Sequence, residues 1–274
     1  MLKAFVHGKV PSELENREDI LTSNVFGTLN YLSNGSLICS LLRNSLNVNN
    51  QTLHIEGENP QVRMWFWPRL ERSEPDLLLS LKTDSQSYLF LIEVKYFSGK
   101  SGEDPAELEA ENNLNQKFYD QLAREYWDLH SGSLYEKIGT EYKTAKKVLI
   151  YLTLNHVFPK QDIENSLRTI RREKAEFRNP ELYWLSWLTF HNELSVWSPS
   201  SEGDSKIKED LLRYLERKGI KSFRGFQLVG ENLLNWKFHS QAISVPVKSY
   251  FSGLKDVQKM EVFYNMEVMM NGNV

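Results

Sequence analysis

The sequence is poor in the residues that build cross-links and thiol-rich metal sites. Its 274 residues include one cysteine, Cys39, which excludes an internal disulfide and a multi-cysteine zinc site. Six histidines are scattered along the chain without zinc-site spacing, and no Gly-x-Ser-x-Gly elbow of an α/β-hydrolase occurs. Cys39 lies in the apolar run Leu37–Leu42, so we expect it in the core and not as a nucleophile.

An excess of charge of one sign and long apolar runs are lacking as well. Lys and Arg number 33 against 36 Asp and Glu, so binding to nucleic acid would require basic residues gathered in one place. No stretch approaches the ~20 apolar residues that span a bilayer. Residues 1–10 lack the apolar segment and cleavage site of a signal peptide. We therefore expect a cytoplasmic globular protein without a membrane partner.

The most informative stretch runs from Glu74 to Gly102. Two apolar runs, Leu77–Leu81 and Tyr88–Val94, have the length and composition of strands and flank the polar segment Lys82–Ser87. Thr83-Asp84-Ser85 is typical turn chemistry. The sequence therefore predicts a β-hairpin here.

The register of this hairpin brings charged side chains together. A turn centred between Asp84 and Ser85 sets Asp76 opposite Glu93, with Cβ atoms roughly 5 Å apart. Lys95 shares a face with Glu93, because residues two apart on a strand point the same way. Facing carboxylates repel unless a cation lies between them, and Mg²⁺ takes one or two protein carboxylates together with waters and phosphates. With Lys95 orienting or activating a water, this arrangement suits phosphodiester hydrolysis.

A simpler interpretation is a surface hairpin in which Glu93 and Lys95 only pair with each other. Glu-x-Lys also occurs at Glu141–Lys143 and Glu216–Lys218, so it is not specific alone. Pro-Asp occurs once, at Pro75-Asp76, directly before the first strand of the hairpin. The joint placement of the two patterns on facing strands favours a functional site.

Pro75-Asp76 followed by Glu93-Val94-Lys95 resembles the signature of the PD-(D/E)XK nuclease superfamily. The resemblance implies a restriction-endonuclease-like fold and a Mg²⁺ cofactor, for which Mn²⁺ substitutes. It implies that Asp76 and Glu93 are metal ligands, with the Val94 carbonyl as a third. It also implies that Lys95 is catalytic.

Two predicted helices carry further candidates. In Glu13–Leu32, Glu18 borders an apolar stripe. The resemblance makes Glu18 an extra metal ligand, whereas helix electrostatics alone would also favour acids in a first turn. In Leu114–Leu129, Gln121 flanks the apolar face, and many superfamily members carry a catalytic glutamine on this helix, sometimes with a tyrosine. Tyr126 follows at a longer spacing than the family pattern.

The remaining elements complete the fold prediction. We expect helices at Gly35–Arg43, Gln161–Phe177 and Lys206–Lys218, and strands at Val62–Trp67, Lys147–Leu154 and Tyr183–Phe190. These give an α/β fold with an αβββαβ core, in which helices flank a mixed sheet.

Pro199–Ser205 has the composition of a linker. It divides a nuclease core, residues 1–200, from an extension, residues 201–274, that packs on the core. The role of this extension stays open between a cap on the sheet, a contact in a homodimer and an element that reads the substrate.

The predicted helix Gln161–Phe177 is a candidate for binding nucleic acid. Its basic residues Arg168, Arg171, Arg172 and Lys174 form the densest basic group in this part of the chain. A solvated helix face is the alternative interpretation. If these residues do contact phosphates, the salt dependence of binding should fall when they are removed.

The sequence thus leads to the expectation of a Mg²⁺-dependent endonuclease or exonuclease that cuts DNA in a bacterial cytoplasm. Restriction, phage defence and DNA repair all fit this activity. An RNase on the same fold is one alternative, so RNA is not excluded as partner. A nucleic-acid-binding or assembly protein without catalysis is another, although the joint presence of Asp76, Glu93 and Lys95 argues against it.

Overall fold

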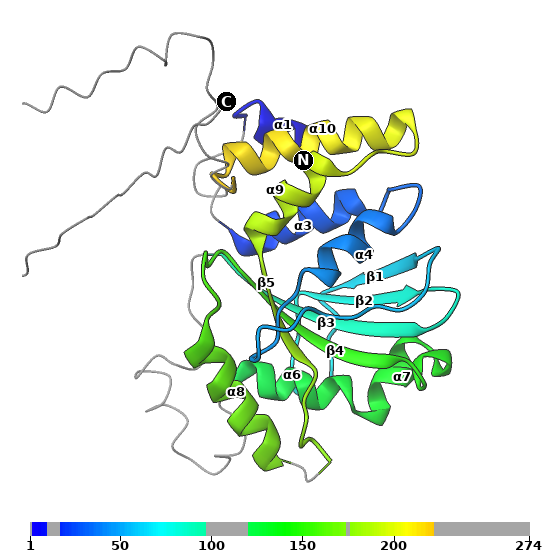
Figure 1. Ribbon diagram of the computed structural model, residues 1–274, viewed down its shortest axis with the longest axis vertical. Coiled ribbons are helices and arrows are strands. Elements are labelled where there is room, and N and C mark those ends of the chain that lie inside the picture. The colour runs from blue at the N-terminus through cyan, green and yellow to red at the C-terminus, as the bar shows by residue number, and fades with distance from the viewer. Residues whose placement is uncertain (1, 10–16, 97–119, 174–175, 222–274) are drawn as a thin grey trace, which may run out of the picture. The chain divides into compact units, whose positions relative to one another are not determined.

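A mixed, open β-sheet lies at the centre of the computed structural model (Figure 1). The structure describes residues 2–9, 17–96, 120–173 and 176–221, all within the unit Met1–Arg224. Within them the strand order is β1-β2-β3-β4-β5. The strands are β1 (Gln61–Phe66), β2 (Leu77–Lys82), β3 (Ser87–Lys95), β4 (Lys146–Thr153) and β5 (Leu182–Ser186). Strands β1 to β3 pair antiparallel, and β3 to β5 pair parallel.

The predicted hairpin is confirmed together with its register. Leu77 pairs with Ile92 and Leu81 with Tyr88, and the turn closes through a 2.9 Å bond from Thr83 N to the Gln86 carbonyl. Continued by one residue beyond β2, this register sets Asp76 opposite Glu93. Because β4 pairs along the other edge of β3, the strand that carries Glu93 is central in the sheet.

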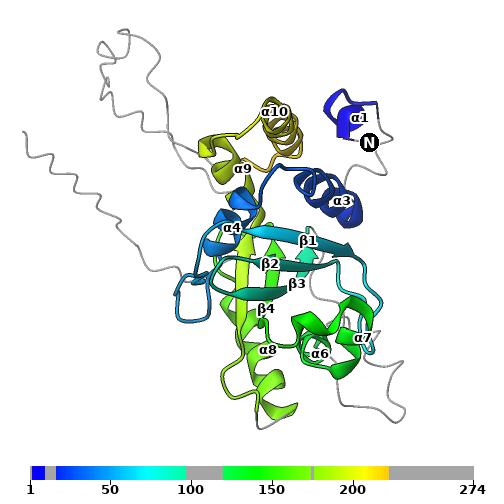
Figure 2. The same ribbon diagram turned by 90° about the vertical axis from the view of Figure 1, so that its right-hand side faces the viewer.

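Helices cover both faces of the sheet (Figures 1 and 2). One layer contains α1 (Leu2–Val6), α3 (Glu18–Leu29), α4 (Ser36–Arg43), α9 (Trp187–Val196) and α10 (Glu202–Arg217). The other contains α6 (Gln121–Leu129), α7 (Gly132–Ile138) and α8 (Lys160–Glu173), with the short 3-10 helix η1 (Thr140–Tyr142) after α7. The α/β class with a mixed sheet flanked by helices is therefore present.

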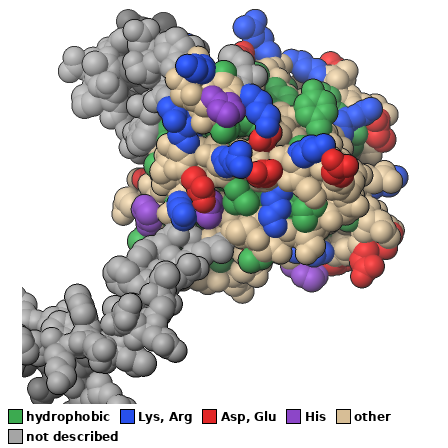
Figure 3. Space-filling model, turned by 90° about the horizontal axis from the view of Figure 1, so that it is seen from above, with side chains coloured by type: hydrophobic (Ala, Val, Ile, Leu, Met, Phe, Trp, Pro, Cys, Tyr) green, Lys and Arg blue, Asp and Glu red, His purple; other side chains and the backbone are tan. Residues whose placement is uncertain are grey.

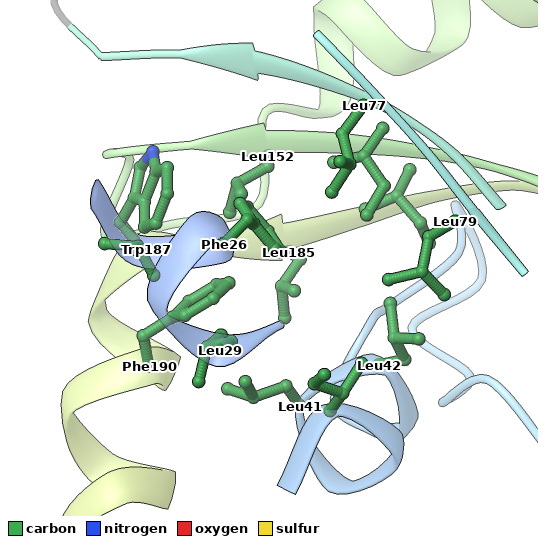
Figure 4. Close-up of a cluster of buried hydrophobic side chains, with 14 of the residues drawn as sticks. Phe26, Leu29, Leu41, Leu42, Leu77, Leu79, Leu152, Leu185, Trp187 and Phe190 are labelled. Carbon is green, nitrogen blue, oxygen red and sulfur yellow. The ribbon is translucent and has the colours of Figure 1, made fainter. Parts of the chain in front are cut away.

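Each face of the sheet has its own hydrophobic core, as the period of two along a strand requires. Leu77 and Leu79 of β2 belong to the core on the α3 side (Figure 4). The same core contains the contacting rings of Phe26, Trp187 and Phe190. Cys39 of α4 is buried in this core, as expected.

The intervening Leu78 packs with Leu89 and Leu91 on the α6 side. Glu93 follows Leu91 at the same spacing. The second core therefore ends at a carboxylate.

The segment after β4 corrects one prediction. The strand expected over Tyr183–Phe190 ends at Ser186, and α9 begins with Trp187. Ser186 is the N-cap of this helix, and its hydroxyl accepts a 3.3 Å bond from Leu188 N. A continuous apolar run does not distinguish a buried strand from a buried helix, so periodicity could not locate the change.

The expected linker Pro199–Ser205 is also partly helical, because α10 begins at Glu202. Ser201 caps this helix by accepting a 3.0 Å bond from Asp204 N. The Asp204 carboxylate in turn accepts hydrogen bonds from the backbone and hydroxyl of Ser33.

The end of α10 agrees better with the sequence. The helix, predicted to end at Lys218, ends at Arg217, and Gly219 with φ +70° follows it. The first helix of the expected extension thus packs into the α3-side core, through Leu211, Tyr214 and Leu215. Residues 222–274 of the extension lie outside the described residues, and the boundary at residue 200 stays a prediction.

The helices that carry the site candidates are shorter than predicted where the structure describes them. The helix expected over Glu13–Leu32 is described as Glu18–Leu29, and residues 10–16 lie outside the described part. Likewise α6 begins at Gln121, and residues 114–119 are not described. None of the helices in the described ranges has the length and apolar character needed to cross a lipid bilayer.

Candidate active site

Asp76 and Glu93 lie together on the α6 side of the sheet, at the end of β3. Both are buried, with 8% and 2% of their surface exposed. The backbone holds Asp76 on both sides: its Oδ2 accepts a 2.8 Å bond from Val94 N, and its carbonyl accepts a 3.1 Å bond from Trp67 N. The carboxylate of Asp76 is therefore fixed against the strand that carries Glu93.

Lys95 bridges this pair to the opposite helix layer. Its Nζ lies 2.7 Å from Glu93 Oε1 and 3.4 Å from Glu18 Oε1. Glu18 Oε2 accepts a 2.7 Å bond from Tyr96 N, which anchors the first turn of α3 to the end of β3. The structure thus brings Glu18 to the same site as Asp76 and Glu93.

Gln121 reaches the site from the first turn of α6. Its Nε2 donates a 2.5 Å hydrogen bond to Glu93 Oε1, the oxygen that also contacts Lys95. The start of the helix is fixed by Asp120, whose side chain accepts from Ala123 N at 3.0 Å and from the Ser166 hydroxyl of α8. Gln121 therefore approaches Glu93 from a well-anchored position.

Glu125, which no sequence pattern singled out, lies beside these residues. Glu125 follows Gln121 by one helical turn and is completely buried. Its position in the sequence was a signal, because an acid stands between Leu122 and Leu129 on the apolar face of α6. Tyr126, the other residue considered on this helix, packs in the core, and its hydroxyl accepts a 3.3 Å bond from Glu181 N.

The electrostatics of the site reflect an excess of buried acid. Burial and the Glu93 carboxylate raise the pKa of Asp76 to about 7, although the Val94 N–H opposes this shift. Burial, with Glu93 and Asp76 nearby, raises the pKa of Glu125 well above its usual range. For Lys95, burial lowers the pKa, but the Glu93, Glu18 and Asp76 carboxylates outweigh burial and raise it. Lys95 is thus held as an ammonium.

The fit of a divalent cation depends on the donor set. Within the described residues, no group of three His, Cys, Asp or Glu side chains is already arranged as a metal cage. Three buried oxygens nevertheless lack a hydrogen-bond donor: Oε1 and Oε2 of Glu125 and Oε1 of Gln121. Carboxylate and amide oxygens are ligands that Mg²⁺ and Mn²⁺ accept. The chemistry of the residues therefore fits a hard cation, while their present geometry is not a finished coordination sphere.

Arg168 and Arg171 make hydrogen bonds within α8 and to the segment before β5. Arg168, Arg171 and Arg172 lie on α8, and Lys174 lies outside the described residues. Strands β4 and β5 are parallel and α8 connects them. The helix therefore runs from the C-terminal ends of the strands, where the site lies, back to the end of the sheet where β5 begins. Arg171 Nε accordingly donates a 3.2 Å bond to the Arg178 carbonyl, shortly before β5. Arg171 and Arg172 thus lie toward the opposite edge of the sheet.

The side of the molecule that carries α1 and α10 has mixed charge. Lys and Arg side chains are interspersed there with Asp and Glu (Figure 3). Several are paired, as Lys3 with Asp210 at 2.6 Å and Arg213 with Glu209 at 2.6 Å. This side therefore shows no basic patch of a single sign among the described residues.

Comparison with protein-family models, with curated proteins and with solved structures gives no match to this chain. No family assignment therefore comes from similarity. The functional conclusion has to be drawn from the residues and geometry of the site itself.

Proposed function

We propose that this chain is a metal-dependent nuclease of the PD-(D/E)XK type that hydrolyses phosphodiester bonds of DNA. One observation supports the proposal most strongly. Asp76, Glu93 and Lys95 are buried together at the end of the central strand, while Glu18 and Gln121 reach the same point from helices on opposite faces of the sheet. Such a concentration of charged groups is unfavourable for folding alone and is typical of functional sites.

The order of the elements supports the same proposal. A helix, three antiparallel strands, a helix and a strand parallel to the third follow one another from α3 to β4, with α4 and α7 as additions. This order corresponds to the αβββαβ arrangement expected from the sequence. The proposed restriction-endonuclease-like core would place its site at the end of β3.

The residues suggest a division of roles. Asp76 and Glu93 would hold a divalent cation, which would stabilise negative charge on the phosphate and lower the pKa of bound water. Val94 lies between Glu93 and Lys95, and its carbonyl stays a proposed third ligand. The Nζ of Lys95 lies 2.7 Å from Glu93 Oε1, beside the proposed cation, so we assign Lys95 to stabilising negative charge on the phosphate.

Glu18 and Gln121 act as positioning residues in this scheme. Glu18 holds the Lys95 ammonium from the α3 side, and its second oxygen fixes the backbone of Tyr96. Gln121 orients Glu93 by donating to Oε1. Together they limit the rotation of both side chains before substrate binds.

Cleavage assays test this proposal directly. The protein is incubated with supercoiled, linear and single-stranded DNA and with RNA, in Mg²⁺, in Mn²⁺ or in chelator. We expect metal-dependent cutting of DNA that Asp76→Ala and Glu93→Ala abolish. Glu74→Ala is the matched control, since Glu74 is an acid two residues before Asp76 that pairs with Arg69 at 3.2 Å on the surface.

The other outcomes of this assay are equally informative. Cutting confined to RNA would make the chain an RNase. Binding of nucleic acid without cleavage under every condition would favour a non-catalytic binding or assembly protein. A homodimer and a cytoplasmic location stay part of the proposal, and sedimentation of the full chain with and without DNA would measure the oligomeric state.

A further inference from the structure

Among the described residues, Glu125 is distinguished by having both side-chain oxygens buried without a hydrogen-bond partner. Its side chain is completely buried, and neither carboxylate oxygen has a hydrogen-bond donor of normal geometry. The Gln121 amide and the Glu93 carboxyl are close enough to influence the pKa of Glu125, but the amide nitrogen is directed to Glu93. An ionised carboxylate that is buried without a partner is costly, so such a group takes up a proton, pairs with a base or binds a cation. In its ionised form, Glu125 therefore requires an electropositive partner that no described residue supplies through a hydrogen bond.

The groups around Glu125 make a cation there still more favourable. Gln121 and Glu125 share one side of α6, and Gln121 donates to Glu93, so the Glu125 carboxyl faces Glu93 and, beyond it, Asp76. Gln121 uses its amide nitrogen on Glu93, which leaves Gln121 Oε1 as a third buried acceptor without a donor. Three unsatisfied oxygens thus lie on the helix that closes over the acidic pair.

The charge balance points in the same direction. Carboxyl groups of Glu18, Asp76, Glu93 and Glu125 act on one another here, while Lys95 supplies one ammonium. This ammonium is already shared between Glu93 and Glu18. A water could donate to the free oxygens but would leave the negative charge in place, whereas a divalent cation satisfies both needs.

We propose that Glu125 is itself a ligand of a divalent cation, bound between α6 and the end of β3 beside Asp76 and Glu93. This inference deepens the proposed function, because it enlarges the ligand set of the same site. It rests on that function only in the assumption that Asp76 and Glu93 bind a cation. The helix α6 then contributes directly to metal affinity, and Gln121 is placed to contact the cation or its water.

Calorimetric titration of the metal-free full-length protein with Mn²⁺ tests the inference without nucleic acid. Glu125→Gln keeps the shape of the side chain and removes its charge, and we expect it to weaken Mn²⁺ binding at least tenfold. The matched control is Asp128→Asn, on the same helix. Asp128 is equally buried, but its carboxylate already accepts from Arg72 N and Ser73 Oγ, so this variant should bind Mn²⁺ like the wild type.

Thermal unfolding guards the result against a folding defect. Metal-free Glu125→Gln should unfold at the wild-type temperature or above it, because a buried acid without a hydrogen-bond partner has been replaced by a neutral amide, and should lose most of the rise that Mn²⁺ produces. If this variant fails to fold, Glu125→Asp retains the charge on a shorter side chain. It should also weaken Mn²⁺ binding, and wild-type affinity in either variant would overturn the inference.

The fate of the proposed function is separate. Wild-type protein that binds Mn²⁺ through Glu125 but cuts no nucleic acid would leave this inference standing and remove the nuclease proposal. Wild-type protein that cuts DNA while Glu125→Gln binds Mn²⁺ normally would do the reverse. A wild-type protein that binds no Mn²⁺ would overturn the inference.

Discussion

Two buried carboxylates, three residues apart on α6, have opposite surroundings. Near the end of the helix, Asp128 is 1% exposed and accepts three hydrogen bonds of 2.6 to 3.2 Å from Arg72 N and the Ser73 hydroxyl, so it joins the helix to the loop before β2. About one turn earlier, Glu125 is as deeply buried and has no donor. The first arrangement is what a stable fold requires, whereas the second adds nothing to the fold. The difference separates a structural acid from a candidate functional one, although both lie on the same helix.

The largest effect that would sharpen this comparison is expected at Lys95. Lys95→Ala removes the ammonium next to Glu93, and cleavage should fall by roughly 10²–10³, the usual cost of losing a positioned group that stabilises transition-state charge. Metal binding should persist or become tighter, since a neighbouring positive charge is removed. A plasmid-nicking assay and a Mn²⁺ titration on the same preparations measure both quantities.

Lys82→Ala serves as the control for this variant, because Lys82 is exposed at the other end of the same hairpin. If Lys95→Ala cut at the wild-type rate, Lys95 would only be the partner of Glu93. Glu93 and Lys95 would then form a structural ion pair, and the surroundings of Glu125 would be structural like those of Asp128.

The next effect concerns the pH dependence of stability. The pKa of Asp76 is raised to about 7, mainly by burial, so the folded metal-free protein keeps this proton to a higher pH than the unfolded chain. Stability attributable to Asp76 is therefore lost as pH rises from about 4 to about 7. Asp76→Asn should gain on the wild type over this window, by about 4 kcal/mol at most. Urea unfolding at a series of pH values would measure it, and a constant difference would show that Asp76 is not under this strain.

A smaller effect, of opposite sign to that at Glu125, is expected at Asp128. Asp128→Ala leaves the Arg72 N–H and the Ser73 hydroxyl without their acceptor, which should cost roughly 1–3 kcal/mol of unfolding free energy. Cleavage per folded molecule should not change. Urea unfolding of this variant beside Glu125→Gln compares directly how much each carboxylate contributes to the free energy of unfolding. Equal destabilisation by both would erase the distinction between them.

The smallest effect is expected on α8. When a basic side chain that neutralises one phosphate of duplex DNA is removed, the slope of log affinity against log salt falls by about 0.9. Because Arg171 and Arg172 lie toward the far edge of the sheet, we expect the double alanine variant to retain the wild-type slope. A slope reduced by about 0.9 or more would support the sequence-based assignment of this helix to nucleic-acid binding.

The hairpin could be predicted from the sequence because its signals are local. Apolar runs of strand length and the turn at Asp84-Ser85 determine which residues face each other, and so the pairing of Leu77 with Ile92 followed from the chain alone. That residues distant in sequence, such as Glu18 and Gln121, come together with the hairpin could be suggested only by the resemblance to the nuclease superfamily. The geometry now places both beside Glu93 and Lys95, while their functional roles stay proposals.

Other features depend on information that a pattern does not contain. Glu125 on an apolar stripe has no visible meaning until the helix is set against the acidic end of β3. The helix after Ser186 was hidden because Trp187 and Phe190 continue the apolar run of β5. The arginines of α8 are close in sequence, but the crossover between parallel strands carries Arg171 and Arg172 away from the site.

The buried thiol of Cys39 can be used to measure local unfolding around α4. Cys39 is 3% exposed in α4, and burial raises the pKa of its thiol, so the reactive thiolate is suppressed in the folded protein. Since this is the only cysteine in the chain, the rate of modification by a thiol reagent measures how often the α4 layer exposes it. A cysteine introduced on an exposed surface would react first, which allows a single probe to be attached without removing a native residue.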